Sequence, residues 1–428
     1  MKIGLIYLPH PYLGQPDAQA PLGLMYLAAV IEMSYSLECE IFNFSSLHTH
    51  EALKALTECD IYGITVTSFE LPQANRFAYL IKELYPKSKI FLGGPGTYSK
   101  EFVDWEVIDS ICIGDGEMTF PQMIKDNNNN ELRKVYHGYP LKNLDNIPFP
   151  ARHKLNSSQG GNIFAYNKQY KGEGSTIIIT SRGCPFQCAF CSSPYFTKTN
   201  KGVRYRSAEN IRDEIISVKA TYNIQQFRIS DDMFMSNKER VYEICDLIGP
   251  LDIAWRISTR VKPFDEELVK VMYQAGCKEV SFGVESFDNH VLKTLKKGTT
   301  AEDNAKAIEI AKKIGMDVRI LFMIKTPGQR KETVPLNIEW LERLPYDIIA
   351  CTTFIPIPGC DIWHNPHDYG ITINDRNLDH YNFYFFGKLG ENKIQNIISF
   401  NDRDNDEVNE ETQQFREYLK NAGKVNRG

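Results

Sequence analysis

The sequence of 428 residues lacks a long apolar run and a strong excess of charge of either sign. The longest apolar stretch, near residues 22–31, is shorter than the about 20 residues that a membrane-spanning helix needs. The first residues hold one lysine and a short apolar run that Pro9 interrupts, which is unlike the core of a secretory signal. We therefore expect a cytoplasmic protein that has no membrane partner.

Net charge and cysteine content exclude further classes of protein. Lys and Arg number 49 and Asp and Glu number 54, and a net charge of −5 gives no broad basic surface for nucleic acid. Hydrophobic residues (42%) and charged residues (24%) are in the globular range, and the length predicts two or three domains. In a reducing compartment the ten cysteines should be thiols or metal ligands and not disulfides.

The first third of the chain alternates apolar strand patterns with helical patterns. Strands are predicted at 2–8, 40–44, 61–67, 89–92 and 110–113, with helices at 22–32, 51–57 and 73–85. Strands this apolar are covered on both faces, so residues 1–135 should form a doubly wound parallel sheet of the Rossmann type. Residues 126–130 (DNNNN) are expected to be a polar loop, and 136–174 a linker.

A second alternating series begins near residue 175. Strands are predicted at 176–180, 226–230, 253–257, 279–283, 317–324 and 347–354, with helices at 208–222, 238–248, 266–275, 289–295, 301–314 and 331–344. Six βα units over residues 175–372 predict a partial (β/α)6 barrel of the TIM type, with its site at the carboxyl ends of the strands. Residues 373–428 should form a small appended segment.

Three cysteines follow the first strand of this predicted barrel. Cys184, Cys188 and Cys191 have C-x3-C-x2-C spacing in the run T-S-R-G-C-P-F-Q-C-A-F-C. Thiolates this close together favour a soft metal. A zinc site would need a fourth ligand, and no Cys or His follows before Cys245. Three thiolates on a cubane cluster leave one iron open for another ligand. The alternatives are three buried thiols or a zinc loop.

This loop resembles the signature of the radical S-adenosylmethionine (SAM) enzymes, and Phe190 before the third cysteine also matches. The resemblance implies that the three cysteines hold a [4Fe–4S] cluster whose open iron binds the amino and carboxylate groups of SAM. One electron then cleaves the sulfonium C–S bond and gives a 5′-deoxyadenosyl radical. The resemblance also implies a small-molecule or peptide substrate and an electron donor such as flavodoxin or ferredoxin.

Further pieces of the barrel resemble the same family. Asp231 and Asp232 end the second strand, Arg260 follows the third and Glu285 ends the fourth. The resemblance implies that these four residues and Phe190 bind SAM. The alternative for an isolated carboxylate is a solvated or salt-bridged side chain.

The substrate side of the barrel departs from the family pattern. The runs M-I-K-T-P-G-Q and F-I-P-I-P-G-C place Gln329 and Cys360 where the family shows Glu and Thr. Cys351 and Cys360 lie near the end of the sixth predicted strand, close to the expected substrate position, so a second role for either residue stays open. The catalytic residues are therefore not assigned from the sequence.

The N-terminal domain resembles the cobalamin (B12)-binding domain that precedes such barrels. The matching pieces are A-P-L-G-L, G-I-T-V-T-S, G-G-P-G and G-D-G-E, each at a strand end, where an open parallel sheet binds its ligand. The implied cobalamin-binding residues are Thr67, Ser68, Gly93, Gly94, Gly114, Asp115, Gly116 and Glu117. The alternative is a flavodoxin-like domain that has tight glycine turns and no cofactor.

One motif of many cobalamin domains is missing. The early loop, residues 10–19, lacks D-x-H-x-x-G, whose histidine binds cobalt from below. The resemblance therefore implies cobalamin without a histidine lower ligand.

Together these pieces predict a cobalamin-dependent radical SAM methyltransferase that acts on an unactivated carbon. The second hypothesis is a radical rearrangement, cyclisation or other modification without methyl transfer. The third is a non-catalytic iron–sulfur electron carrier, which would have no need of six βα units. Substrate identity and oligomeric state stay open.

Overall fold

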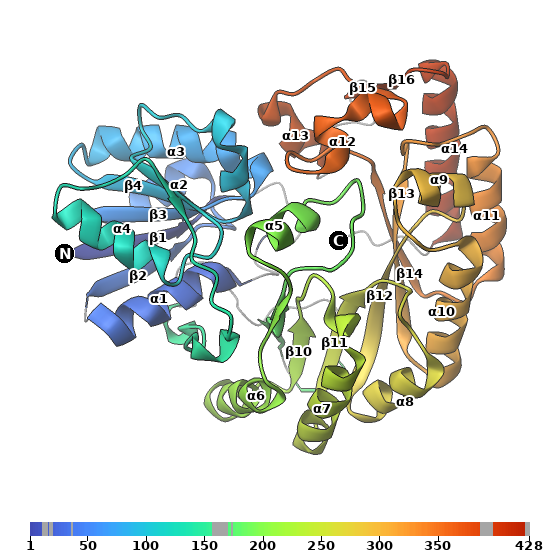
Figure 1. Ribbon diagram of the computed structural model, residues 1–428, viewed down its shortest axis with the longest axis horizontal. Helices are drawn as coiled ribbons and strands as arrows, with labels where there is room; N and C mark the ends of the chain where they lie inside the picture. The colour runs from blue at the N-terminus through green and yellow to red at the C-terminus, as the bar shows by residue number, and fades with distance from the viewer. Residues whose placement is uncertain are drawn as a thin grey trace.

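The computed structural model describes residues 1–10, 16, 20–35, 37–155, 170–172, 174–385 and 397–423. Figure 1 shows two α/β units side by side, the N-terminal one in blue and teal and the second in green to orange. Both units and their order along the chain agree with the sequence analysis. None of the described helices is long and apolar enough to cross a membrane.

The N-terminal unit is a parallel sheet of six strands. Its order is β2-β1-β3-β4-β5-β6, so the chain moves outward from β1 in both directions, which is the doubly wound pattern. The strands are β1 (Lys2–Tyr7), β2 (Glu38–Asn43), β3 (Ile61–Thr65), β4 (Lys89–Gly93), β5 (Ser110–Ile113) and β6 (Val135–His137). The helices are α1 (Leu22–Tyr35), α2 (Thr49–Ala55), α3 (Leu71–Leu84) and α4 (Thr119–Asn128).

Helix α4 corrects the prediction of a loop at 126–130. Asp126 stays within the helix because its carboxylate accepts hydrogen bonds from the Tyr136 hydroxyl at 2.7 Å and from the Gln122 amide at 2.5 Å. Tyr136 belongs to β6, a strand that the sequence analysis did not predict, and β6 pairs with β5 at the sheet edge. A tertiary contact therefore extends the helix three residues into a polar run, to Asn128.

The second unit is a parallel sheet of order β14-β13-β12-β11-β10-β7, and β7 and β14 are its two edges among the described residues. The partial barrel is thus confirmed. Its strands are β7 (Thr176–Ile178), β10 (Gln226–Ile229), β11 (Ala254–Thr259), β12 (Cys277–Glu285), β13 (Asp317–Ile324) and β14 (Ile348–Thr353). The outer helices are α6 (Ala208–Tyr222), α7 (Lys238–Ile248), α8 (Glu266–Gln274), α9 (Asn289–Thr294), α10 (Ala301–Ile314) and α11 (Thr333–Arg343).

A short hairpin and a helix follow β7 and were not predicted. Strands β8 (Ser181–Arg182) and β9 (Arg204–Tyr205) pair in antiparallel fashion. Helix α5 (Ser193–Thr199) lies between them in sequence, and it starts directly after the third cysteine of the motif. In Figure 1 this helix projects between the two units.

The C-terminal segment is part of the core and not a small appendage. Helix α14 (Asn405–Ala422) packs on α11, and Phe415 stacks on Phe322 of β13 with ring centroids 5.5 Å apart. Helices α12 (Asp361–His364) and α13 (Leu378–Phe385) and the antiparallel pair β15 (Ile371–Ile373) and β16 (Ile398–Phe400) precede it. Tyr381 of α13 stacks on Phe69 of the first unit at 5.9 Å. The segment therefore joins both units.

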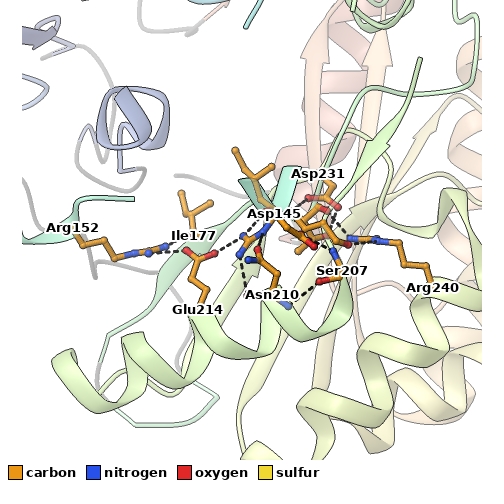
Figure 2. Close-up of polar contacts among 11 residues, drawn as sticks. Asp145, Arg152, Ile177, Ser207, Asn210, Glu214, Asp231 and Arg240 are labelled. Carbon is orange, nitrogen blue, oxygen red and sulfur yellow. Dashed lines mark hydrogen bonds and ion pairs between the residues drawn. The ribbon is translucent and has the colours of Figure 1, made fainter. Parts of the chain in front are cut away.

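A buried polar network fastens the linker to the barrel (Figure 2). Arg152, in the short 3-10 turn Arg152–Lys154, forms an ion pair with Glu214 of α6 at 2.7 Å, and the other oxygen of Glu214 pairs with Arg206. All three side chains are buried. Arg152 also donates to the Ile177 carbonyl of β7 at 2.9 Å, so one carboxylate balances two guanidinium groups under the first barrel strand.

Glu214→Gln should destabilise the protein, because it leaves Arg152 and Arg206 buried without a counter-charge. Loss of one partner from a buried ion pair costs about 3–5 kcal/mol. The free energy of unfolding of the metal-free protein, from urea denaturation, measures this loss. The control is Asp213→Asn, which changes the neighbouring exposed carboxylate and should alter stability by less than about 0.5 kcal/mol. Equal stability of the two variants would contradict a structural role for the network.

Candidate functional site

A cavity of about 370 Å³ lies between the two units, at the carboxyl edge of the first sheet. Six of the eight residues predicted to bind cobalamin line it: Gly93, Gly94, Gly114, Asp115, Gly116 and Glu117. The opposite wall comes from the β8–β9 hairpin, α5 and the end of β10. The loops of the Rossmann-like sheet and the segments on either side of the cysteine motif therefore line one cavity, whereas Cys184, Cys188 and Cys191 are not among its lining residues.

Thr67 and Ser68 do not line the cavity. The backbone N–H of Thr67 donates to the Glu70 carboxylate at 2.5 Å, and Ser68 lies 3.4 Å from the Ser99 hydroxyl. These contacts build the turn after β3. Thr65, the last residue of that strand, lines the cavity in their place.

The glycines at the rim differ in what they allow. Gly94 has φ +89°, and a Cβ there would lie 2.7 Å from the Val66 carbonyl oxygen, so only glycine fits this turn. Gly93, the last residue of β4, has no positive φ, and a Cβ there would meet nothing within 4 Å. The missing side chain of Gly93 thus leaves space in the cavity, whereas Gly94 is required because the turn needs a positive φ and has no room for a Cβ.

Two arginines of the second unit hold the G-D-G-E loop. Arg204 of β9 pairs with Asp115, and Arg182 of β8 pairs with Glu117 at 2.5 Å and with Asp115 at 3.4 Å. Arg182 precedes Cys184 by two residues, so these ion pairs connect the cavity loop directly to the cysteine loop. The sequence analysis missed both arginines. Arg182 was visible within T-S-R-G-C, but no local signal distinguishes Arg204.

Aromatic side chains close one wall of the cavity. Tyr98, from the segment after β4, packs against Phe196 of α5 with ring centroids 4.5 Å apart. Burial raises the pKa of Tyr98 to about 12, so its hydroxyl stays protonated near neutral pH. This wall is therefore apolar and uncharged where the two units meet.

The three cysteines lie in the loop between β8 and α5, as the motif predicted. Cys188 is buried, and Cys184 and Cys191 are partly buried. Burial raises the pKa of Cys184 to about 11 and also raises that of Cys191, and the neighbouring thiols add to both shifts. The loop is fixed by the Cys184 N–H, which donates to Thr197, and by the Ala189 N–H, which donates to the Leu295 carbonyl.

No three Cys, His, Asp or Glu side chains in the described residues converge on one metal position. In a cubane cluster each thiolate binds a different iron, so three thiolates in one loop are a donor set that such a cluster can use.

Asp231 and Asp232 have different surroundings. Asp231 is buried and accepts hydrogen bonds from the Thr180 N–H at 2.6 Å and the Ser181 hydroxyl at 2.6 Å. Figure 2 shows it beside Arg240, which donates to the Thr180 carbonyl at 2.7 Å. Asp232 lines the cavity, and enclosure among protein atoms raises its pKa. Asp231 shapes the backbone before the cysteine loop, whereas Asp232 is accessible to a ligand.

Glu285 and Arg260 are both buried near the cysteine loop. Glu285 ends β12 with φ +67°, a strained conformation for a residue other than glycine, and pairs with Lys297 at 3.0 Å. Arg260 donates to the Cys188 sulfur at 2.7 Å. Lys297 lies 5.7 Å from the centroid of the Phe190 ring. The sequence analysis missed Lys297, although it lies in the run V-L-K-T-L-K-K-G that carried the resemblance.

Cys351 and Cys360, whose roles the sequence left open, lie apart in the structure. Cys351 lies beside α14, in a second cavity of about 210 Å³ that Ile324 and Arg416 also line. Cys360 is the N-cap of α12, and its sulfur accepts from the Trp363 N–H at 3.3 Å. Burial raises the pKa of Cys360 to about 11, and nearby Cys191 adds to the shift. Only Cys360 therefore lies near the cysteine motif.

Gln329, the other departure from the family pattern, contacts α14. Its amide donates to the Glu411 carboxylate at 2.9 Å.

The early loop places its histidine away from the cavity. His10, three residues after β1, is buried and pairs with Glu70 at 2.8 Å. Most of the loop that follows, residues 11–15 and 17–19, lies outside the described residues.

Comparisons with known proteins agree with this geometry. The family model described as the radical SAM superfamily matches residues 178–341, and the B12 binding domain model matches residues 18–124. An uncharacterized methyltransferase of Pyrococcus horikoshii is 31% identical, covering 83% of this chain and 79% of its own length. Cytidylyl-2-hydroxyethylphosphonate methyltransferase of Streptomyces wedmorensis is 25% identical, covering 81% and 78%.

Solved structures share the fold over most of the chain. The radical SAM methyltransferase TsrM from Kitasatospora setae, with cobalamin and a [4Fe–4S] cluster bound, has a TM-score of 0.67 at 16% identity, covering 88% of this chain and 81% of its own. The cobalamin-dependent radical SAM enzyme OxsB, with aqua-cobalamin bound, has a TM-score of 0.64 at 21% identity, covering 80% and 52%. With both family models matched in order and a relative of 31% identity, the chain belongs to the radical SAM superfamily, within the family of cobalamin-dependent radical SAM methyltransferases.

Proposed function

We propose that this enzyme methylates an unactivated carbon of a small molecule, with Cys184, Cys188 and Cys191 as cluster ligands and the interdomain cavity as part of the cobalamin site. One observation carries the proposal. The cavity extends without a break from Gly93 on the first sheet to Asp232 beside the cysteine loop. A methyl donor and a radical source held at its two ends would act on the same substrate.

The cysteine loop fits a cluster. Cys188 is buried and the other two cysteines are partly buried, and the Cys191 sulfur accepts from the Ser193 N–H at 3.4 Å. Hydrogen bonds to the sulfurs and limited solvent exposure are the features by which a protein adjusts an iron–sulfur cluster.

The cavity fits part of a cobalamin. Leu24, Leu92 and Phe120 give it apolar walls, and Gly93 leaves the strand end open for close approach. Asp115 and Glu117 are neutralised by the two arginines, so the rim does not repel the phosphate of a nucleotide tail. We therefore assign Gly93, Gly94, Gly114 and Gly116 to backbone approach, and Asp115 and Glu117 to positioning of the loop.

Glu285 is the residue we assign to SAM. Its carboxylate is held by Lys297, and a Cβ on Gly283 would lie 2.8 Å from the Glu285 oxygen, so Gly283 leaves room for this side chain. Phe190 and Asp232 would contact the same ligand from the cysteine loop and from the end of β10.

When bound, the cluster and SAM supply a radical that removes a hydrogen atom, and cobalamin supplies the methyl group. The chain contributes orientation and exclusion of water. Trp363 packs against Phe102 with ring centroids 6.4 Å apart and against Tyr381 at 5.9 Å, which joins the C-terminal segment to the first unit.

We propose that a flavodoxin or ferredoxin supplies the electron in the cytoplasm, since the cluster needs a low-potential donor. We also propose the domain limits 1–135 for the cobalamin domain, 136–174 for the linker, 175–372 for the barrel and 373–428 for the C-terminal segment.

Replacement of Cys184, Cys188 and Cys191 by alanine should abolish the cluster. Anaerobically reconstituted wild type should hold about four irons per chain, and the triple variant should hold almost none and make no 5′-deoxyadenosine. Iron analysis and chromatography of the products measure both. The control is Cys245→Ala, a buried thiol of α7, which should keep its iron. A triple variant that still forms 5′-deoxyadenosine would overturn the assignment.

Glu285→Gln should weaken SAM binding by about 1–3 kcal/mol, the cost of a lost charge-assisted contact, while the iron content stays at the wild-type level. Equilibrium dialysis of the reconstituted protein gives the dissociation constant. Glu302→Gln, an exposed residue of α10, is the control and should bind SAM normally. An unchanged affinity of Glu285→Gln for SAM would show that this residue has only a structural role.

Gly93→Val should block cobalamin uptake without unfolding the protein. Valine is well suited to a strand end, and its methyl groups would enter the cavity. Bound cobalamin is measured by absorbance after gel filtration, with Gly249→Ala as the control, because a Cβ at Gly249 meets its nearest neighbours at 3.6 Å. Cobalamin binding at the wild-type level in Gly93→Val would place the cofactor elsewhere.

A further inference from the structure

We propose that Arg260 raises the reduction potential of the cluster through a charged hydrogen bond to the Cys188 sulfur. The proposal rests on the proposed function, because it needs the three cysteines to hold a cluster. It gives Arg260 a role that differs from the SAM contact implied by the family resemblance.

The three cysteine sulfurs have different hydrogen-bond donors. Cys191 accepts from the Ser193 N–H, and Cys184 accepts from the Phe186 N–H, so both receive neutral backbone amides. Cys188 instead accepts from the Arg260 guanidinium at 2.7 Å. A charged donor is roughly twice as strong as a neutral one. Among the described donors to these sulfurs, Arg260 is therefore the one that brings a full positive charge.

The position of Arg260 is fixed by three contacts. Its Nη2 donates to the Lys297 carbonyl, and its guanidinium carbon lies 4.0 Å from the centroid of the Phe186 ring. Phe186 belongs to the cysteine loop, between Cys184 and Cys188. The side chain is buried, with 7% of its surface exposed, so water does not screen the charge effectively.

This arrangement has a definite electrostatic consequence. Reduction adds one negative charge to the cluster, and a fixed positive charge in contact with a ligand sulfur stabilises the reduced state. Hydrogen bonds to the sulfurs and net charge are known determinants of cluster potential. Arg260 should therefore make the cluster easier to reduce by its one-electron donor, before SAM binds.

A planar guanidinium is suited to this position in a way that an ammonium group is not. One face stacks on Phe186 while the two terminal nitrogens reach the sulfur and a carbonyl in different directions. Lysine would keep the charge but lose the simultaneous contacts. The Lys variant should consequently lie between wild type and neutral variants.

The test is a redox titration of the reconstituted protein without SAM. The electron paramagnetic resonance signal of the reduced cluster measures the reduced fraction at each potential. Arg260→Gln and Arg260→Met should shift the midpoint potential to more negative values, and Arg260→Lys should shift it less. The control is Lys296→Gln, which removes an exposed cation that pairs with Asp361 and should leave the potential unchanged. Equal potentials in wild type and both neutral variants would overturn the proposal.

A second measurement does not depend on the variants holding a cluster. Pulsed electron paramagnetic resonance of wild type grown with ¹⁵N-labelled arginine should show coupling between the reduced cluster and an arginine nitrogen. Absence of that coupling would also overturn the proposal. Failure of the wild type to bind about four irons would instead refute the cluster assignment itself. The two failures are thus distinguishable.

Discussion

The contact between the G-D-G-E loop and the arginines of the β8–β9 hairpin is the constraint on which the site depends. Asp115 and Glu117 come from the first unit, and Arg182 and Arg204 from the second. Buried charges are costly unless they are paired, so the four groups are stable only when the two units are docked. Because Arg182 lies two residues from Cys184, this pairing sets the distance between the glycine rim and the cysteine loop.

The fold was largely predictable because its strands are apolar and regularly spaced. All eleven strands predicted from apolar runs are present, and the longest, β12, is buried along almost its whole length. The elements that were missed are held by tertiary contacts. Helix α4 extends into a polar run because Tyr136 binds Asp126, and the β8–β9 hairpin has only two residues in each strand. Such contacts leave no periodic pattern in the sequence.

The positions of the loops around the cavity were predictable where a motif has a fixed spacing. The cysteine loop and the two glycine loops lie where their motifs indicated. Thr67 and Ser68 do not line the cavity and build a turn that Glu70 and Ser99 hold. The partners of predicted residues were also missed. Lys297 and Arg204 act on Glu285 and Asp115 across 12 and 89 residues of sequence, and pairing at such separations is visible only in the folded chain.

Helix α14 has a consequence for the order in which the molecule is made. Its residues Phe415 and Leu419 belong to the same apolar core as β13, yet they follow the barrel strands in the chain. During synthesis, the apolar face of the last barrel strands must stay uncovered until α14 has left the ribosome. The barrel therefore cannot complete its packing one strand at a time during synthesis. The nascent chain exposes an apolar surface, which is the kind of surface that chaperones bind.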